Sequence, residues 1–399
     1  MEWGIITKDN FKSISDVPIK RWDPLSTVVI KKKGFGLRNQ VRYSGRFSYI
    51  SPIRGKRPQS YMDDSNEALD CSKLANISDI FSSITEGKAI YNNDGMLLRD
   101  GNTIIITEDE IRRDNPFSDT PRKLEPLDPS VKAITLINRY PSMVRVIDPD
   151  LKSTMDVKLP PNSKISRGIN LLTISRDFYP ALCFDLIPEE VLAGIFLSMK
   201  AAILYSVEEA INNDYYDILI SPFFNIGRKV GGSQPRIHSQ VYIDLNGDGH
   251  GSRLGGYLQA FEEMNECRLC HTSHDESNRI VIQSKYWTYY ATGSPVRNYH
   301  LRFYPTEHIR RFANLKPNQI QDLALTLKLI FTALDKLGVE RNRNIILNCC
   351  PYGYDADFHL FGDIIPHEII GGAEMADDMR VARKLPENTA KEIRDTIKQ

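Results

Sequence analysis

The sequence predicts an α+β protein made of two similar units, each an antiparallel sheet covered by one long helix. The main observation is an order of elements that occurs twice along the chain. In each unit, a helical pattern opened by proline is followed by a strand, a loop and a second strand. Short loops join neighbouring strands in antiparallel fashion, and an amphipathic helix then covers one face of the resulting sheet.

In the first unit, the repeated order begins with a helix at Pro188, and proline fits a helix start because its missing N–H would have no partner there. Apolar residues recur at helical spacing over 191–204. Strands are then expected over Asp217–Phe224 and Ile237–Leu245, on either side of the glycine-rich loop Gly227–Gly232. This order gives one helix and one antiparallel strand pair.

The second unit repeats the same order. Pro317 opens a helical pattern with apolar residues over 320–334, and strands are expected over Asn344–Cys349 and Phe358–Ile365. In each unit, the second strand carries a histidine near its start. Such internal similarity indicates a duplicated domain. The two histidines are His238 and His359.

The remaining segments set the domain division. Residues 1–40 are mixed polar and basic, and we expect an N-terminal extension or an edge hairpin there. The predicted domains are 41–250 and 251–399, with the boundary inside Asn246–Glu266, where glycine, aspartate and serine dominate. Further strand-like runs occur at Phe47–Ile50, Asn102–Thr107, Ala133–Asn138, Met143–Ile147 and Gly168–Ser175.

Composition excludes several classes of function. The chain has 399 residues, with 51 Lys and Arg against 51 Asp and Glu, so its formal charge is zero. This balance argues against a nucleic-acid partner held by a strongly basic surface. No run approaches the roughly 18 apolar residues of a membrane-spanning helix, and no secretory signal is visible. Six cysteines are too few for a disulfide scaffold. We therefore expect a cytoplasmic protein without a membrane partner.

The segment from Asn225 to Gln240 has the composition of a phosphate site. Three glycines, two cations and Ser233 precede a strand on which His238 and Gln240 share one face. Backbone N–H groups of a glycine loop bind phosphate oxygens, and a neutral imidazole can attack phosphorus. The alternative is an interior histidine that is hydrogen-bonded within the sheet, with glycines that serve only the turn.

Four short segments resemble, in order, those of the galactose-1-phosphate uridylyltransferase family, which belongs to the histidine-triad superfamily. Ser233–Gln240 (S-Q-P-R-I-H-S-Q) is similar to the family's active-site segment S-N-P-H-P-H-G-Q. Together the segments span most of the chain and imply two histidine-triad-like repeats. The other three are Ser51–Pro58, Asn138–Pro141 and Gly372–Glu374, which resemble S-P-H-R-A-K-R-P, N-[KR]-[FY]-P and G-[FY]-E.

The resemblance also implies roles for individual residues. His238 is the expected nucleophile, which takes a nucleoside monophosphate onto a ring nitrogen. Gln240 is expected to hold that phosphoryl group, and Ser233 to donate to its oxygens. The residues expected to contact the rest of the substrate are Asn225, Arg54 and Arg57 for the nucleotide and its phosphates, and Glu374 for the sugar hydroxyls.

Members of this family transfer a nucleoside monophosphate in two steps, through a nucleotidyl-histidine. The resemblance therefore implies a transferase of carbohydrate metabolism whose partners are a nucleotide sugar and a hexose 1-phosphate, as in galactose metabolism. It also implies a possible homodimer. Phosphorolysis of a nucleotide sugar or of a dinucleoside polyphosphate is the close alternative. An inactive nucleotide-binding protein is the alternative from another class.

A second constellation is Cys267–Cys270, which has the C-x-x-C spacing of a zinc knuckle. His271 and His274 are nearest in sequence, but a full ligand set within so short a segment would strain the chain. In relatives of the phosphorylase type, one histidine near a helix start and one on the last strand complete the site. We expect about one structural zinc per chain; the alternative is a reduced thiol pair. The implied metal ligands are Cys267, Cys270, His308 and His359.

The first unit departs from the family, because relatives usually hold a further zinc there. Asn115 and Ser118 stand at the family's cysteine positions, and Arg236 stands at the first histidine of the active-site segment. No cysteine or histidine lies between Cys71 and Cys183. The resemblance therefore implies that this zinc site is lost. We expect hydrogen bonds and an ion pair from Arg236 to brace the loop in its place.

Two further patterns favour a structural interpretation. The aromatic run Tyr286–Tyr290 could form a stacking platform for a base, but aromatic strands more often belong to the core. Cys349 and Cys350 lie on an apolar strand and are expected to pack inside the protein, not to bind metal.

Overall fold

The computed structural model of the chain describes residues 163–247 and 252–399, apart from positions 265, 276, 355–356 and 378. In the part before residue 163, it describes the segments 5–6, 19–32, 40–50, 81–85, 98–100, 103–105, 130–138, 141–144 and 146–147 and the positions 51, 54, 57, 71, 79 and 159.

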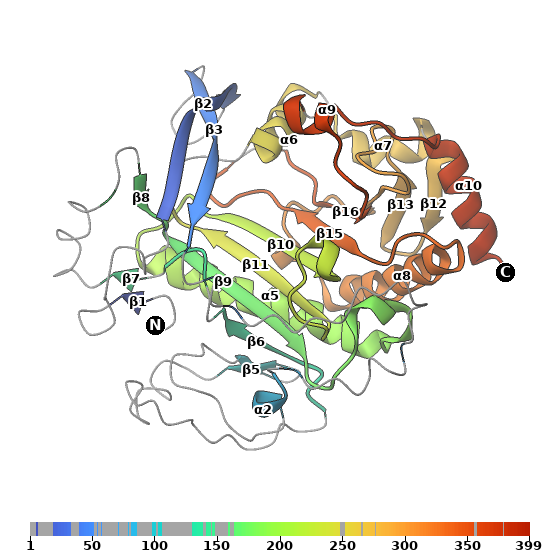
Figure 1. Cartoon of the computed structure of the whole chain (residues 1–399), viewed down its shortest axis with the longest axis horizontal. Coiled ribbons are helices and arrows are strands. Elements are labelled where there is room, and N and C mark those ends of the chain that lie inside the picture. Colours follow the sequence, from blue (N-terminus) through green and yellow to red (C-terminus); the bar gives the residue numbers. More distant parts are fainter. Residues whose placement is uncertain are drawn as a thin grey trace.

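A nine-stranded antiparallel sheet forms the centre of the molecule (Figure 1). Its strands are β6 (Ala133–Ile137), β9 (Gly168–Ser175), β10 (Leu219–Ile226), β11 (His238–Asp244), β12 (Ile280–Gln283), β13 (Trp287–Ala291), β14 (Leu301–Pro305), β15 (Arg343–Asn348) and β16 (Phe361–Pro366). Their spatial order is β12-β13-β14-β16-β15-β10-β11-β9-β6. The two units meet where β10 pairs with β15, with Asn225 opposite Asn344. The predicted α+β architecture is confirmed, and both units share one continuous sheet.

Two long helices, α5 (Glu189–Asn212) and α8 (Pro317–Lys336), pack against each other and against the sheet. The ring centroids of Phe196 in α5 and Phe224 in β10 lie 5.4 Å apart, and each such buried side chain contributes roughly 1.5–3 kcal/mol. Among the described helices, α5 alone is long and apolar enough to cross a membrane. Most of it is buried between the sheet and α8, which accounts for its apolar composition.

The opposite face of the sheet, called here the open face, carries polar residues of the candidate site. Because Phe224 points to α5, its neighbours Phe223 and Asn225 point to the open face. Directly paired residues share a face, and Gln240 pairs with Phe223. His238, two residues before Gln240, therefore lies on the open face as well, and Asn344 joins it from the second unit through its pairing with Asn225.

A second, smaller core lies over the second unit, where α6 (Ser252–Glu263) and α7 (Arg268–Asp275) pack on the sheet. The rings of Tyr257 and Phe361 meet edge to face at 5.0 Å, and those of Phe261 and Phe358 lie 4.7 Å apart. The aromatic run around Tyr290 is core, as expected: Trp287 and Tyr289 in β13 are fully buried. The two cysteines at 349 and 350 are buried too, as predicted.

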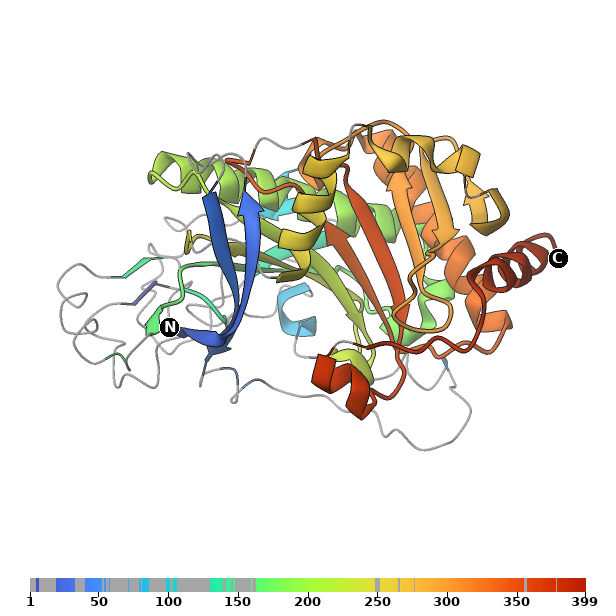
Figure 2. The same cartoon turned by 90° about the horizontal axis from the view of Figure 1, so that it is seen from above.

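The N-terminal segment contributes a long hairpin, β2 (Ile19–Lys32) with β3 (Gln40–Ile50), which extends away from the sheet (Figures 1 and 2). At its base β2 also pairs with β8 (Ser163–Ile165). The Tyr49 hydroxyl donates a hydrogen bond to Asp244, the last residue of β11. Of the two expectations for this segment, the structure therefore supports the edge hairpin, and the hairpin touches the strand that carries His238.

Some expectations for individual elements were wrong. The run Met143–Ile147 yields only β7 (Val146–Ile147), paired in parallel with β1 (Ile5–Ile6). The segment Asn246–Glu266, which was expected to contain the domain boundary, also contains the helix α6, whose Gly255 and Gly256 weaken the helical pattern. The domain boundary itself stays a prediction. Described elements that the sequence did not predict, or predicted only in part, also include α2 (Ser82–Thr85), β4 (Leu98–Asp100), β5 (Thr103–Ile105), η3 (Ala181–Leu186), η4 (Arg228–Val230), η5 (Ser277–Arg279), η6 (Phe312–Asn314), α9 (Gly372–Asp377) and α10 (Pro386–Ile397).

Candidate active site and metal centre

His238 is the first residue of β11, and its side chain is 4% exposed. Its Nδ1 lies 2.7 Å from the backbone oxygen of Arg236. A carbonyl oxygen can only accept, so Nδ1 carries the proton and Nε2 keeps its lone pair. Burial lowers the pKa of His238, the positive charge of Arg57 lowers it further, and the Arg236 carbonyl and Asp79 oppose this shift. The ring is therefore neutral at physiological pH, which is the form that can attack phosphorus.

A second buried histidine shows what a purely structural imidazole looks like in this fold. His300 accepts a hydrogen bond from the backbone N–H of Val296 at Nδ1, and its Nε2 lies 3.0 Å from Asp363. Both ring nitrogens of His300 are thus engaged. His238 differs, because within the part of the chain that the structure describes its Nε2 makes no hydrogen bond. The alternative of an interior histidine fits His300 better than it fits His238.

The loop between β10 and β11 requires glycine at two positions. Gly227 has φ of +92°, and a side chain there would meet Asn342 Oδ1 at 2.2 Å. A side chain at Gly232 would meet the backbone oxygens of Asn225 and Gly227 at 2.6 and 2.7 Å. These contacts close the loop tightly, with the Gly232 N–H donating to Gly227 O at 3.0 Å. Ser233 follows directly and is half-buried.

Asn225 is held by a residue of the second unit. The Nδ2 group of Asn344 donates to Asn225 Oδ1 at 2.8 Å. This contact uses the oxygen of Asn225, so its amide nitrogen is the group that remains to face a ligand. In the same strand region, Asn342 Oδ1 accepts the backbone N–H of Lys229 in the glycine loop at 3.0 Å. The sequence analysis missed Asn342 and Asn344, because their role depends on the pairing of two units.

Arg54 and Arg57 lie in a folded turn, not in an extended strand. The N–H of Arg54 donates to Ser51 O, and the N–H of Arg57 donates to Arg54 O, at 3.1 and 3.2 Å. An extended strand would place the two side chains on opposite sides. The Ser51 hydroxyl donates to Pro141 O at 2.8 Å, which brings two of the four family-like segments together. The charge of Arg57 also acts on His238.

Glu374 lies in the first turn of α9 and faces arginines. Its two carboxylate oxygens each lie 2.9 Å from Arg297 Nη1, and Arg380 Nε is 3.5 Å away. The described contacts of Glu374 include none with His238 or Gln240. Its expected contact with sugar hydroxyls stays a prediction.

Arg236 is buried under the nucleophile segment and braces it, as expected. Its side chain is 2% exposed, and its guanidinium donates to both carboxylate oxygens of Asp79. It also donates to the backbone oxygens of Ser175 and Arg176, at 3.0 and 2.8 Å. The predicted ion pair from Arg236 is confirmed, with Asp79 as the partner that the sequence did not identify. The two polar residues at the family's cysteine positions lie outside the described residues.

A disulfide joins Cys71 to Cys183, and the sequence analysis did not predict it. The bridge closes a sequence separation of 112 residues. Cys183 lies in η3, and the residue before η3, Pro180, forms a backbone bridge with Arg236. The only signal in the sequence was that these are the two cysteines of the first unit. The disulfide and the ion pair therefore attach two early residues, Cys71 and Asp79, to the backbone around Arg236, next to His238.

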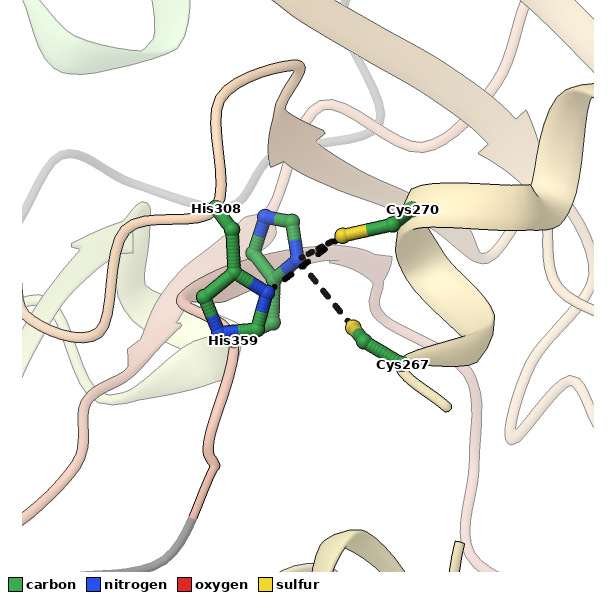
Figure 3. Close-up of side chains that lie close together, drawn as sticks. All are labelled: Cys267, Cys270, His308 and His359. Carbon is green, nitrogen blue, oxygen red and sulfur yellow. Dashed lines mark hydrogen bonds between the residues drawn. The ribbon is translucent and has the colours of Figure 1, made fainter. Parts of the chain in front are cut away.

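Four side chains of the second unit converge as a candidate metal centre (Figure 3). Their ligand atoms all lie within 4.8 Å of one another. The thiols come from the start of α7, one histidine from the loop after β14, and the other from just before β16. The grouping is the one that the family resemblance implied, and the neighbouring His271 is no member of it. The four residues are Cys267, Cys270, His308 and His359.

The donor set fits a tetrahedral zinc ion. Zn–S bonds of about 2.3 Å and Zn–N bonds of about 2.0 Å place sulfur and nitrogen ligands about 3.5 Å apart. The structure has Cys267 Sγ at 3.4 Å and Cys270 Sγ at 3.5 Å from His359 Nδ1, and Cys270 Sγ at 3.3 Å from His308 Nδ1. Because all four positions are filled by protein, the site is of the structural type and keeps none open for a substrate.

A protein oxygen orients the outer nitrogen of His359, whose Nε2 donates to the backbone oxygen of Pro305 at 2.9 Å. The Nδ1 of His359 therefore faces the sulfurs with a lone pair. His308 Nε2 lies 3.1 Å from Asp357 Oδ1 without forming a hydrogen bond to it. Burial and the nearby His308 lower the pKa of His359 to about 4, so the imidazole is in its neutral, metal-binding form. Burial and Cys267 raise the pKa of Cys270 to about 12, a thiol that a cation would deprotonate.

No protein-family model and no curated protein sequence matches the chain. Solved structures, in contrast, are similar to this chain. A uridylyltransferase matches with a TM-score of 0.56 and 21% identity, over 67% of this chain and 85% of that one. A GalT-like protein from Arabidopsis thaliana matches with a TM-score of 0.55 and 21% identity, over 68% and 85%. An ADP-glucose phosphorylase from Arabidopsis thaliana with bound ADP-glucose matches at 0.50 and 22%, over 67% and 83%. The predicted resemblance is confirmed at the level of the fold.

Proposed function

We propose that the protein is a nucleotidyltransferase that moves a nucleoside monophosphate from a nucleotide sugar to a phosphate-bearing acceptor through a nucleotidyl-histidine at position 238. The observation that carries the proposal is the state of this imidazole: neutral, fixed at Nδ1 and free at Nε2 among the described residues. The shared fold with uridylyltransferases and with a nucleotide-sugar phosphorylase supports an enzyme of this class.

In the first step, His238 Nε2 attacks the α-phosphorus of the nucleotide sugar. The new P–N bond forms as the bond from phosphorus to the bridging oxygen breaks, and the sugar 1-phosphate leaves with that electron pair. Arg54 and Arg57 are proposed to neutralise the phosphates, while the Ser233 hydroxyl and the Gln240 amide donate to the phosphoryl oxygens. Donors that are held in place before the reaction would need little reorganisation as the charge develops.

In the second step, an oxygen of the acceptor phosphate attacks the same phosphorus and expels His238. A hexose 1-phosphate as acceptor yields a new nucleotide sugar, which is the transferase reaction that we favour. Inorganic phosphate as acceptor yields a nucleoside diphosphate. This phosphorylase reaction is the second candidate, because the Cys₂His₂ cluster stands where the resemblance to phosphorylase-like relatives places their zinc.

We further propose that the cluster holds one zinc ion, through Cys267, Cys270, His308 and His359. When bound, this ion would act as a cross-link and supply no reacting group. A homodimer stays part of the proposal and is open to light scattering. A cytoplasmic location also stays a prediction, and the disulfide between Cys71 and Cys183 is of a kind more typical of oxidising compartments.

The proposed intermediate is tested by trapping it. UDP-glucose and ADP-glucose, each labelled at the α-phosphate, are incubated with the protein and quenched in base, where phosphohistidine survives. We expect label on the wild type and on the control variant His367→Asn, which removes a histidine of the second unit, and none on His238→Asn. Adding glucose 1-phosphate, galactose 1-phosphate or inorganic phosphate to the labelled protein then separates the transferase from the phosphorylase by the product released.

Two results would count against the proposal. Undiminished label on His238→Asn would show that another group carries the nucleotide. Binding of both nucleotide sugars without any label on the wild type would favour the inactive nucleotide-binding protein instead.

A further inference from the structure

Asp79 is buried next to the nucleophile segment, although it lies 157 positions earlier in the chain than its partner Arg236. The Asp79 side chain is 0% exposed. Its Oδ1 accepts hydrogen bonds from the backbone N–H groups of Phe81 and Ser82, each at 3.0 Å, and from the Ser82 hydroxyl at 3.0 Å. The carboxylate thus caps the start of α2 and is fixed before it meets the guanidinium.

The Arg236 guanidinium is equally constrained. It reaches both oxygens of Asp79, which is the fork-like geometry of the strongest arginine–carboxylate pairs. Its Nη1 donates to the backbone oxygens of Ser175 and Arg176, at the end of the strand next to β11. The planar ion therefore cannot turn without losing contacts on two sides.

The backbone of Arg236 connects its fixed side chain to His238 in the candidate active site. Its carbonyl oxygen is the atom that receives Nδ1 of His238, at 2.7 Å. The flanking backbone is held as well: the Ala181 N–H donates to Pro235 O at 2.7 Å, and the Ile237 N–H donates to Tyr179 O at 2.8 Å. A side chain anchored at one end and a hydrogen-bonded backbone at the other leave the 236 carbonyl a single orientation.

We propose that Asp79 is a positioning residue for His238: by anchoring Arg236, it holds the 236 carbonyl against Nδ1, so that Nε2 keeps the lone pair that faces the substrate. The inference rests on the proposed function and adds to it a residue from a distant segment. Removing only the carboxylate leaves a guanidinium buried without its counter-charge, which is strongly unfavourable. We therefore expect the Arg236 side chain to move toward water and to displace the 236 carbonyl.

The Cys71–Cys183 disulfide is a second, independent link between this early part of the chain and the backbone near Arg236. Cys183 is three residues after Pro180, which bridges to Arg236, and Cys71 is on the same early segment as Asp79. The segment is therefore attached by one covalent bond and one ion pair. This arrangement explains how a carboxylate from so far away in sequence keeps a fixed position.

The inference is tested on the full chain with Asp79→Asn, which keeps the shape of the side chain and removes its charge. The control is Asp335→Asn, which breaks a comparable ion pair with Arg343 in the second unit. Imidazole nitrogen NMR of protein with ¹⁵N-labelled histidine reports the tautomer of His238, whose signals are assigned by their loss in His238→Asn. We expect the Nδ1–H form in the wild type and in the control, and a mixture of tautomers in Asp79→Asn.

Two kinetic measurements test the same inference: the rate of labelling and its dependence on pH. The single-turnover rate of labelling by UDP-glucose or ADP-glucose should fall on the order of 10²-fold in Asp79→Asn, less than the roughly 10⁴-fold lost when a catalytic histidine is held wholly in the wrong tautomer, because a mixture is expected here. The nucleotide-sugar concentration that gives half the maximal rate should change little. Because the charges acting on His238 are Arg57 and Asp79, losing the negative one should move the acidic limb of the rate profile to lower pH. A merely destabilising substitution would leave that limb in place.

The inference is wrong if Asp79→Asn keeps the wild-type tautomer of His238, even if the variant is less stable or its acidic limb moves, because the lost charge alone can move that limb. A wild type that takes no label from either donor would refute the proposed function, whereas the NMR comparison would still decide the role of Asp79. Should Asp79→Asn fail to fold, Asp79→Glu and Arg236→Lys keep a charge pair with altered geometry, and the same tautomer measurement applies to them.

Discussion

At the scale of single residues, the candidate site depends on which atoms are already engaged. Nδ1 of His238 is occupied by a backbone carbonyl, and Oδ1 of Asn225 is occupied by Asn344. Each contact leaves the opposite atom of the same side chain to face a ligand: a lone pair at His238 and an amide donor at Asn225. Hydrogen bonds inside the protein thus define the polarity of the site before any ligand arrives.

Asn344 is therefore expected to affect ligand binding without touching the ligand. In Asn344→Ala, the Asn225 amide is released and can turn its oxygen outward, toward phosphate oxygens that repel it. We expect the dissociation constant for UDP-glucose or ADP-glucose, measured by calorimetry, to rise about tenfold, which corresponds to about 1.4 kcal/mol. The free energy of unfolding should fall by roughly 1 kcal/mol, which is the usual contribution of one hydrogen bond.

The matched control is Asn348→Ala on the same strand and face. Asn348 Nδ2 donates to Asp363 Oδ2 at 3.3 Å, so its amide is engaged with the neighbouring strand β16 instead of with Asn225. Equal effects of the two substitutions on nucleotide-sugar binding would show that Asn344 has no special role toward Asn225.

At the scale of elements, the metal centre connects three parts of the second unit that also contribute to its smaller core. It joins α7 to the loop after β14 and to the segment that leads into β16. All four ligands come from loops or from the start of a helix, where few backbone hydrogen bonds hold the chain. A metal ion at this point would add a cross-link to the packing of nearby buried side chains such as Phe358.

We predict about one zinc per chain by elemental analysis, and none in Cys270→Ser, whose midpoint of thermal unfolding should be lower by about 5 °C or more. The control is Cys350→Ser, because Cys350 is buried but lies outside the cluster. Two tightly bound metals per chain, or full zinc content in Cys270→Ser, would contradict this prediction.

The metal-free protein should also respond to acid in a defined way. The pKa of His359 is lowered to about 4 in the folded chain, mainly by burial, whereas an exposed histidine has a pKa of about 6.5. The unfolded state therefore binds the proton first, and the contribution of His359 to stability is complete above pH 6.5 and is lost progressively as the pH falls from about 6.5 to about 4. Urea unfolding of chelator-treated protein at a series of pH values measures this loss, which should be smaller in His359→Gln.

At the scale of the whole molecule, the two units do not fold on separate cores. The main apolar core includes Phe184 and Phe331, one from each unit, whose rings stack at 4.1 Å. The sheet also runs through the boundary, by way of the β10–β15 pair. Separating the units would expose two strand edges and this apolar surface to water.

We therefore expect thermal unfolding in a single cooperative transition, with the same midpoint by far-UV circular dichroism and by tryptophan fluorescence. Of the three tryptophans, Trp287 is fully buried in β13 and is the one in the second unit. With Trp3 and Trp22 replaced by phenylalanine, fluorescence reports on the second unit, while the far-UV signal averages over both. Two separated transitions would instead support independent domains divided near residue 250. Because the metal cross-links only the second unit, the zinc-loaded protein is the form to measure.

The sequence was a reliable guide wherever a local pattern decides structure. Helices α5 and α8 begin at or just after the predicted prolines, and β9 matches its predicted bounds, because apolar periodicity and helix-start chemistry act within a few residues. It missed α6, in which two glycines interrupt the pattern. It also missed Asp79, because nothing near residue 79 indicates an arginine 157 positions later.

By itself, the sequence determined the repeated order of elements, the C-x-x-C pair and the family-like segments around His238, and the family resemblance added two histidines as candidate metal ligands. Residue type, spacing and short motifs belong to a chain whether or not it is folded. Only the tertiary structure decided that Asn344 fixes Asn225, that Asp79 anchors Arg236 and that the two units share one sheet. Such contacts join residues more than a hundred positions apart, and their geometry exists only after the chain has brought them together.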